Sequence, residues 1–233
     1  MRKICLIALA LSIFLPLHAR KLYITRHGQV GFPEYHDHEV RETMLTPLGQ
    51  EQAHLLGIHL KNVQKFNGTI LVSPILRTIE TGVIIADILG KKVILETGIQ
   101  EVNRTHHVNG MTLEQIEKRF HGKYIPGRNF SWPWRVTNEN PEIWSKRYIR
   151  EMDRIFKEYS GDLLLVTHGG GVSSMVTELC RRGDLVTRGI GYNCSLFIFE
   201  LDENDLPVSV TYVINYIPRE KITSNHTYPF AGK

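Results

Sequence analysis

The chain has 233 residues, of which 42% are hydrophobic and 22% charged, and its formal net charge is +4. This length suits one sizeable domain, and the composition is that of an ordinary globular protein and does not indicate disorder. Loss of Arg2 and Lys3 with a leader peptide would lower the charge to +2, which is too small a bias to indicate binding to nucleic acid or a membrane surface.

Residues 1–19 have the pattern of a secretory signal peptide. Arg2 and Lys3 precede an apolar run at residues 4–17, and Ala19 supplies a small residue for cleavage. The run is shorter than the roughly 20 residues that a membrane-spanning helix needs. We therefore expect cleavage after Ala19, a periplasmic or secreted protein, and no stable membrane insertion afterwards. An uncleaved N-terminal anchor is the alternative.

The first half of the remaining chain alternates short apolar strands with helical patterns. A β-rich strand is expected at residues 21–25, followed by a polar stretch. Thr46-Pro47 is typical of an N-cap with proline at the first helical position, so a helix is expected to begin there. The alternation continues with a strand at 69–72, a helix starting at Ser73-Pro74, and a strand at 92–95.

Residues 102–140 break this alternation, and we interpret the segment as a small lid insertion over one end of the sheet. Thr112 and Gln115 have the spacing of a capping box, which predicts one short helix. Trp132 and Trp134 lie in a stretch rich in aromatic residues and arginine. A role for these two side chains in covering a substrate is open.

After the insertion the alternation resumes. Asn140-Pro141 starts a helix that is expected from Glu142 to about Tyr159. The next expected elements are a strand at 162–167, a helix from Gly169 onward, and strands at 195–201 and 208–214. Strands that alternate with helices predict an α/β fold. We expect residues 20–233 to form one domain, a three-layer αβα sandwich with a mostly parallel central sheet.

Two histidines follow the ends of predicted strands. His27 follows the strand at 21–25, and His168 follows the strand at 162–167. The carboxyl ends of parallel strands meet at one edge of an α/β sheet, where ligands bind. Arg26 lies next to the first histidine, so the sequence predicts a site for an anion at this edge.

Four motifs around these residues occur in a fixed order. They are Arg26-His27-Gly28, Leu45-Thr46-Pro47-Leu48-Gly49, Ser73-Pro74-Ile75-Leu76-Arg77-Thr78 and Thr167-His168-Gly169-Gly170. Together they resemble the histidine phosphatase superfamily, in its branch of phosphoglycerate mutases and related phosphatases. The resemblance extends over about residues 21–201.

The resemblance implies a role for each matching residue. His27 would be the nucleophile that accepts the phosphoryl group, and Arg26, Arg77 and His168 would hold the phosphate oxygens. Glu101 falls where the family places its acid/base. The segment Asn193-Cys194-Ser195 also resembles a family segment at the start of a late strand.

The chemistry of these residue types agrees with those roles. Arginines match the oxygens of a phosphate dianion in a bidentate manner, and neutral imidazole is a competent nucleophile. Arg26 and Arg77 should disfavour protonation of His27. A carboxylic acid at Glu101 could protonate the leaving oxygen and later take a proton from water. This scheme requires no metal and no other cofactor.

The sequence also departs from the family pattern. Val30 replaces the usual threonine two positions after the glycine of the first motif, and the asparagine expected shortly beyond is absent. The long signature blocks of phosphoglycerate mutases are absent as well, which argues against a mutase. His168 is followed by glycine rather than aspartate, which argues against the acid phosphatase and phytase branch.

Two other residue groups allow alternatives. The loop residues His36, Asp37, His38, His106 and His107 could be metal ligands, but no helical His-Glu-x-x-His spacing accompanies them, so we expect no metal site. Cys180 and Cys194 remain after cleavage of the leader. An exported compartment permits a disulfide between them, and the sequence leaves their pairing open.

We therefore expect an exported, metal-independent phosphomonoesterase that acts on a small-molecule phosphate monoester and binds no nucleic acid. A mutase-like phosphotransferase is one alternative. A non-catalytic binder of phosphorylated ligands is the other, and Val30 lends it some support. Glu34, Glu114 and His106 are the next candidates for the acid after Glu101. The sequence indicates neither the substrate nor the oligomeric state.

Overall fold

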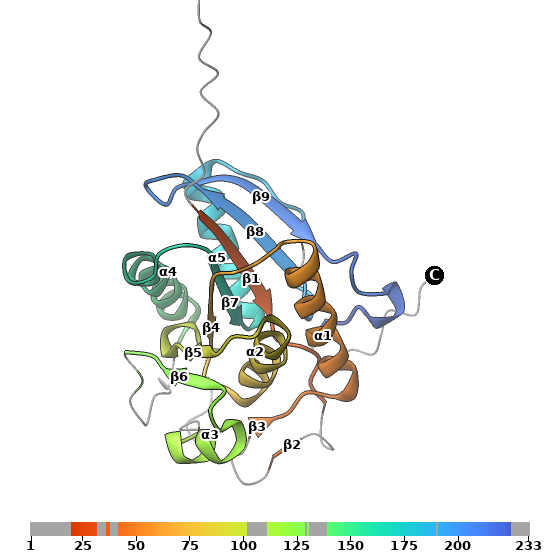
Figure 1. Cartoon of the computed structure of the whole chain (residues 1–233). Coiled ribbons are helices and arrows are strands. Elements are labelled where there is room, and N and C mark those ends of the chain that lie inside the picture. Colours follow the sequence, from red (N-terminus) through yellow and green to blue (C-terminus); the bar gives the residue numbers. More distant parts are fainter. Residues whose placement is uncertain are drawn as a thin grey trace, which may run out of the picture.

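The computed structural model describes residues 20–31, 36–37, 42–101, 111–128, 130, 139–189 and 191–224 (Figure 1). The expected signal peptide lies outside these ranges, so cleavage and export stay predictions. His38, His106, His107, Trp132 and Trp134 lie outside them too. Within the described ranges, no helix combines the length and apolar character that crossing a membrane would need.

A seven-stranded sheet forms the centre of the protein. Its strand order is β6 (Tyr124–Pro126), β5 (Val93–Leu95), β4 (Thr69–Val72), β7 (Leu163–Thr167), β1 (Arg20–Arg26), β8 (Leu196–Leu201) and β9 (Pro207–Val213). The first five strands in this order run parallel, whereas β8 and β9 each run antiparallel to their neighbours. The mostly parallel sheet that we expected is thus confirmed.

Helices cover both faces of this sheet, which confirms the three-layer arrangement (Figure 1). On one face, α1 (Pro47–Asn62) and α2 (Leu76–Leu89) pack with Tyr23 of β1. On the other face, α4 (Pro141–Glu158) and α5 (Gly169–Gly183) pack with the neighbouring strand residues Leu22 and Ile24. Successive side chains of a strand point to opposite faces, so one continuous apolar strand serves both cores.

Local sequence signals set the starts of three helices. Thr46 caps α1, since its hydroxyl accepts a hydrogen bond from Gly49 N at 3.0 Å. Thr112 and Gln115 form the expected capping box of α3 (Leu113–Phe120). Asn140 caps α4 through two backbone N–H groups. By contrast, α2 starts at Leu76, three residues later than Ser73, and has no side-chain cap.

The structure contains strands that the sequence did not indicate. β6 lies inside the expected lid segment at 102–140 and pairs with β5, so this part of the segment is an edge of the sheet rather than a cover over it. Ile116 of α3 is buried in the core on the α1 and α2 face. A short antiparallel pair, β2 (His36–Asp37) and β3 (Glu42–Thr43), lies in the polar stretch before α1.

Candidate active site

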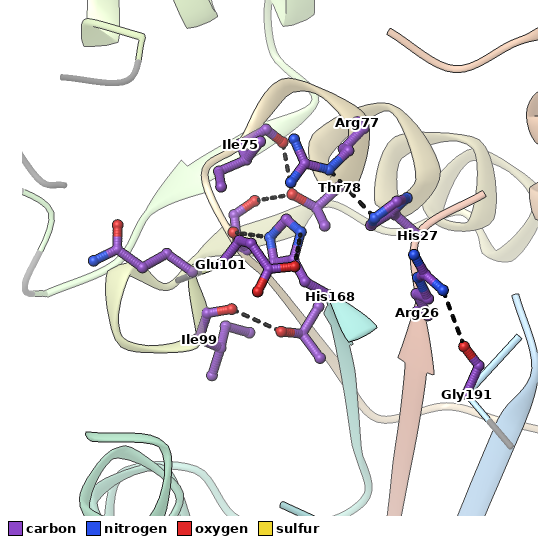
Figure 2. A network of polar contacts seen from close by, with 12 residues as sticks. Arg26, His27, Ile75, Arg77, Thr78, Ile99, Glu101, His168 and Gly191 are labelled. Carbon is purple, nitrogen blue, oxygen red and sulfur yellow. Dashed lines mark hydrogen bonds and ion pairs between the residues drawn. The ribbon is translucent and has the colours of Figure 1, made fainter. Parts of the chain in front are cut away.

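The carboxyl ends of β1, β4 and β7 meet at one edge of the sheet, as the strand register requires. Arg26 pairs with Thr167, and Val72 with Val166. The residues that follow these ends therefore converge, and the short helix η1 (Thr97–Ile99) after β5 brings Glu101 to the same edge. Figure 2 shows His27, His168 and Glu101 gathered there beneath the first turn of α2.

His27 is held in one tautomer by its two partners. Its Nδ1 lies 2.7 Å from Gly28 O, and a carbonyl oxygen can only accept a hydrogen bond. Its Nε2 lies 3.2 Å from Arg77 Nε, and a guanidinium can only donate. The proton must therefore lie on Nδ1, which leaves the lone pair of Nε2 directed towards Arg77.

The backbone around His27 is anchored by buried polar side chains. Asn193 Nδ2 donates to His27 O at 2.9 Å, and Gly28 N donates to Thr81 Oγ1 at 3.0 Å. Gln29 N donates to Gln52 Oε1 at 2.9 Å. Asn193, Thr81 and Gln52 are each fully buried. We call residues 27–29 with these three contacts the nucleophile loop.

Close packing explains the glycine of the first motif and the valine that follows it. A Cβ atom on Gly28 would come within 2.3 Å of Gly49 O, so any larger residue would push the nucleophile loop away from the start of α1. Val30 is buried and forms a β-bridge with Leu45. The valine thus packs in the interior where the family pattern has a hydroxyl.

Arg26 is a buried cation with incomplete hydrogen bonding. It is 6% exposed, and its Nη1 donates to Gly191 O at 3.3 Å. Its Nε has no acceptor among the described residues. Burial lowers the pKa of Arg26 from 12.5 to about 10, with Glu101 raising it and Arg77 lowering it further. Arg26 still carries a positive charge at neutral pH, so this position favours an anion.

His168 and the start of α5 complete the site. The ring is fully buried, its Nε2 lies 2.8 Å from Ser73 Oγ, and its centroid lies 5.3 Å from that of His27. His168 is the N-cap of α5, and a Cβ atom on Gly169 would lie 3.5 Å from Arg26 Cζ. Since the N-terminus of a helix favours negative charge, α5 adds to the pull of the arginine.

Glu101 lies beside His168. Its Oε2 lies 3.9 Å from His168 Nδ1, and its side chain is 30% exposed. The structure therefore places together all five side chains that the sequence analysis assigned to the site: Arg26, His27, Arg77, Glu101 and His168 (Figure 2).

A groove of about 870 Å³ adjoins the site at Arg26 and Gly169 and extends along α5 past Val176. Gly191 also lines this groove. In Figure 2, Gly191 lies on the opposite side of Arg26 from Glu101. Glu101 is not among the residues that line this groove.

Other candidate residues lie elsewhere or have a packing role. Trp144 is half-buried and packs against the core on the α4 and α5 face. Cys180 and Cys194 are both free, so no disulfide joins them. Burial raises the pKa of the Cys194 thiol far above its ordinary value, so this thiol stays protonated. Within the described ranges, no group of three or more metal-binding side chains occurs.

Similar proteins were found at the levels of family, sequence and structure. Residues 22–213 match the model of the histidine phosphatase superfamily, branch 1. The chain is 26% identical over 164 residues to the "Putative phosphoserine phosphatase 2" of Hydrogenobacter thermophilus, an alignment that covers 69% of this chain and 78% of that protein.

Solved structures of low sequence identity share the fold. YhfR of Bacillus stearothermophilus has a TM-score of 0.61 at 21% identity, covering 86% of this chain and 100% of YhfR. The ecdysone phosphate phosphatase of Bombix mori, solved with tungstate, has a TM-score of 0.59 at 19% identity, covering 85% of this chain and 93% of that protein. Because the family model spans most of the sequence, the chain belongs to the histidine phosphatase superfamily, branch 1.

Proposed function

We propose that this protein is an exported phosphatase that hydrolyses a small phosphate monoester through a phosphohistidine on His27 and uses no metal. Membership of the family and the phosphatase relative support a hydrolase acting on phosphate esters. The orientation of His27 carries the proposal, because the lone pair of Nε2 lies beside Arg77 while Nδ1–H is held by Gly28 O.

In the first step, Nε2 of His27 attacks phosphorus and the bond to the ester oxygen breaks. Arg26 and Arg77 stabilise the charge on the phosphoryl oxygens, and protonated Glu101 gives its proton to the leaving alkoxide. Phosphorylation makes the imidazole cationic, and its Nδ1–H bond to Gly28 O stabilises that charge.

In the second step, the Glu101 carboxylate takes a proton from water while the water oxygen attacks phosphorus. The N–P bond breaks, its electron pair returns to Nε2, and inorganic phosphate leaves. In-line attack requires the leaving ester oxygen to lie opposite Nε2 in the first step and the attacking water oxygen to lie there in the second. Glu101 lies beside His168 at the same edge of the sheet, and we assign it the proton transfer at these two oxygens (Figure 2).

Trapping of the intermediate tests the covalent step. Rapid acid-free quenching with a labelled phosphate ester should give an acid-labile label that maps to His27. A label on serine or aspartate would exclude the mechanism. Phosphoserine is the first substrate to test, because the relative from Hydrogenobacter thermophilus is named for it.

Product analysis and chelation test the remaining parts. Release of inorganic phosphate indicates hydrolysis, whereas phosphate retained on carbon indicates a mutase, and binding without turnover indicates a non-catalytic binder. Two arginines take the place where metallophosphatases use divalent ions. Activity should therefore survive exhaustive chelation, and a loss restored by zinc or magnesium would exclude the metal-free scheme.

A further inference from the structure

Three consecutive backbone carbonyls lead directly to Glu101, and each accepts a hydrogen bond from a buried side chain. Arg147 Nη1 donates to Gly98 O at 2.6 Å and to Gln100 O at 3.2 Å. Thr167 Oγ1 donates to Ile99 O at 2.7 Å. The hydroxyl of Tyr148 donates to Gln100 O as well. We call Arg147, Tyr148 and Thr167 the carbonyl clamp.

Through Thr167, the clamp connects the segment before Glu101 to the backbone at both His27 and His168. Thr167 is the last residue of β7 and immediately precedes His168, while its backbone oxygen accepts from His27 N at 3.0 Å. The same residue therefore contacts the acid segment with its side chain and the nucleophile with its backbone. Figure 2 shows Ile99 and Glu101 next to His168 in this arrangement.

A buried ion pair fixes the clamp itself. Glu139 accepts from Arg147 Nε at 2.6 Å and from Nη2 at 2.8 Å, and both residues are almost fully buried. This fork leaves Nη1 of Arg147 aimed at the two carbonyls. A buried ion pair costs much desolvation free energy and is weak evidence of a stabilising role by itself. Arg147, however, also binds the carbonyls of Gly98 and Gln100, directly before Glu101, which points to a role in positioning that residue.

The protonation states of the clamp are constant. Burial acts to lower the pKa of Arg147, but its hydrogen bonds and charge interactions with Glu139 and Tyr148 together raise it. Burial, and next the charge of Glu101, raises the pKa of Tyr148 well above its ordinary value. Both side chains therefore remain donors over the whole working range of pH.

The segment also packs closely against α4. A Cβ atom on Gly98 would come within 2.2 Å of Glu151 Cγ, so a larger residue here would require the Glu151 side chain to move. The Glu101 carboxylate, in contrast, lies 3.9 Å from His168 Nδ1, which is beyond hydrogen-bond distance. The backbone that the carbonyl clamp holds leads directly to this carboxylate.

We propose that Arg147, Tyr148 and Thr167 are positioning residues that hold the Glu101 carboxyl group within reach of the leaving oxygen. This inference rests on the proposed role of Glu101 as the acid. A misplacement of about 1 Å can cost roughly 100-fold in rate. Loss of a clamp contact should therefore slow the same proton transfer that Glu101 performs, while the phosphate-binding groups stay unaffected.

The variants are Arg147→Lys, Tyr148→Phe and Thr167→Val. The first keeps a cation for Glu139 but loses the planar fork, and the other two remove a single hydroxyl each. Arg182→Met is the matched control, because Arg182 pairs with Asp153 of α4 and with Glu178, and it touches none of the carbonyls before Glu101. Each variant is assayed with esters whose leaving groups range from acidic phenols to alkyl alcohols, in single turnovers that report phosphorylation of His27.

The expected result is a loss that grows with the basicity of the leaving group. Arg147→Lys should slow alkyl esters about tenfold or more, with a smaller loss for Tyr148→Phe and Thr167→Val. Esters of acidic phenols and the affinity for vanadate should change less than twofold. The control should match the wild type throughout. In a Glu101→Gln background, the clamp substitutions should have no further effect, because the step they support is already lost.

Two outcomes would overturn the inference. An equal loss for all leaving groups would show that the clamp supports the fold alone, and so would full additivity with Glu101→Gln. A separate result concerns the proposed function. If Glu101→Gln itself leaves the leaving-group dependence unchanged, Glu101 is not the acid and the positioning role falls with it.

Discussion

The segments that carry His27 and Glu101 are held in different ways. His27 is 3% exposed, and both of its ring nitrogens and the surrounding backbone have fixed partners. Glu101 is 30% exposed, and its segment is held through the three carbonyls before it. The difference fits the proposed chemistry, because a nucleophile must keep one tautomer and direction, whereas an acid must reach a leaving group and then water.

The largest effect should come from removing His27, the proposed nucleophile. His27→Ala should abolish phosphate release, with a loss of roughly 10⁴-fold or more, because no covalent intermediate can form. Turnover and label incorporation would be measured together with circular dichroism. If a well-folded variant still hydrolyses esters at an appreciable rate, His27 is not the nucleophile, and the comparison of the two segments has no basis.

Glu101→Gln should cause the next largest effect and a selective one. Glutamine cannot give a proton, so esters with basic leaving groups should react roughly 10²–10⁴-fold more slowly. Esters of acidic phenols need little protonation and should be affected less in the first step. Arg26 and Arg77 remain in place, so vanadate binding should persist. If both enzymes slow equally as the leaving group becomes more basic, the acid lies elsewhere, and Glu114 is a candidate within the described residues.

Asn193→Ala tests whether the His27 and Glu101 segments are held independently, because its effect on the rate should not depend on the leaving group. The substitution removes the hydrogen bond to His27 O and the contact with Thr223, so it loosens the nucleophile loop. We expect a loss of about tenfold that is the same for all leaving groups. Tyr148→Phe should instead give a loss that depends on the leaving group. The same dependence in both variants would mean that the two segments are not held independently.

The same contrast explains what the sequence could and could not predict. Arg26, His27 and Gly28 are adjacent, and a motif at a strand end needs no long-range information. The groups that hold them come from distant helices: Gln52 and Thr81 project from α1 and α2, and their burial is visible only after folding. A polar residue in a helix looks the same whether its side chain meets solvent or a backbone N–H.

The carbonyl clamp could not be predicted from the sequence for a related reason. The helix from Pro141 to Glu158 was predicted from its N-cap, but nothing marks Arg147 among its charged residues as the buried one. β6 was missed because Tyr124–Pro126 is short and contains proline, which edge strands tolerate. Boundaries set by local capping were predicted well, and elements that depend on their neighbours were not.

The smallest expected effect is a change in the free energy of unfolding, caused by the buried charge of Arg26 in the proposed phosphate site. Arg26 is buried with an Nε that has no acceptor among the described residues, and an unsatisfied buried donor costs about 1–3 kcal/mol. Arg26→Met should therefore lose activity and phosphate binding, yet raise the free energy of unfolding at pH 7 by on the order of 1 kcal/mol. Phosphate should stabilise the wild type and not the variant.

The pKa of Arg26 also predicts how the difference in stability between the wild type and Arg26→Met changes with pH. The pKa of Arg26 is lowered from 12.5 to about 10 in the folded protein, so above pH 10 the unfolded chain binds more protons than the folded one. The stability of the wild type should therefore rise relative to that of Arg26→Met as the pH increases from 10 towards 12.5. Denaturant unfolding at pH 7 and above pH 10 measures the difference. If the variant is instead less stable than the wild type at pH 7, Arg26 stabilises the folded protein even without an anion. The proposal that Arg26 favours anion binding at the expense of stability would then be wrong.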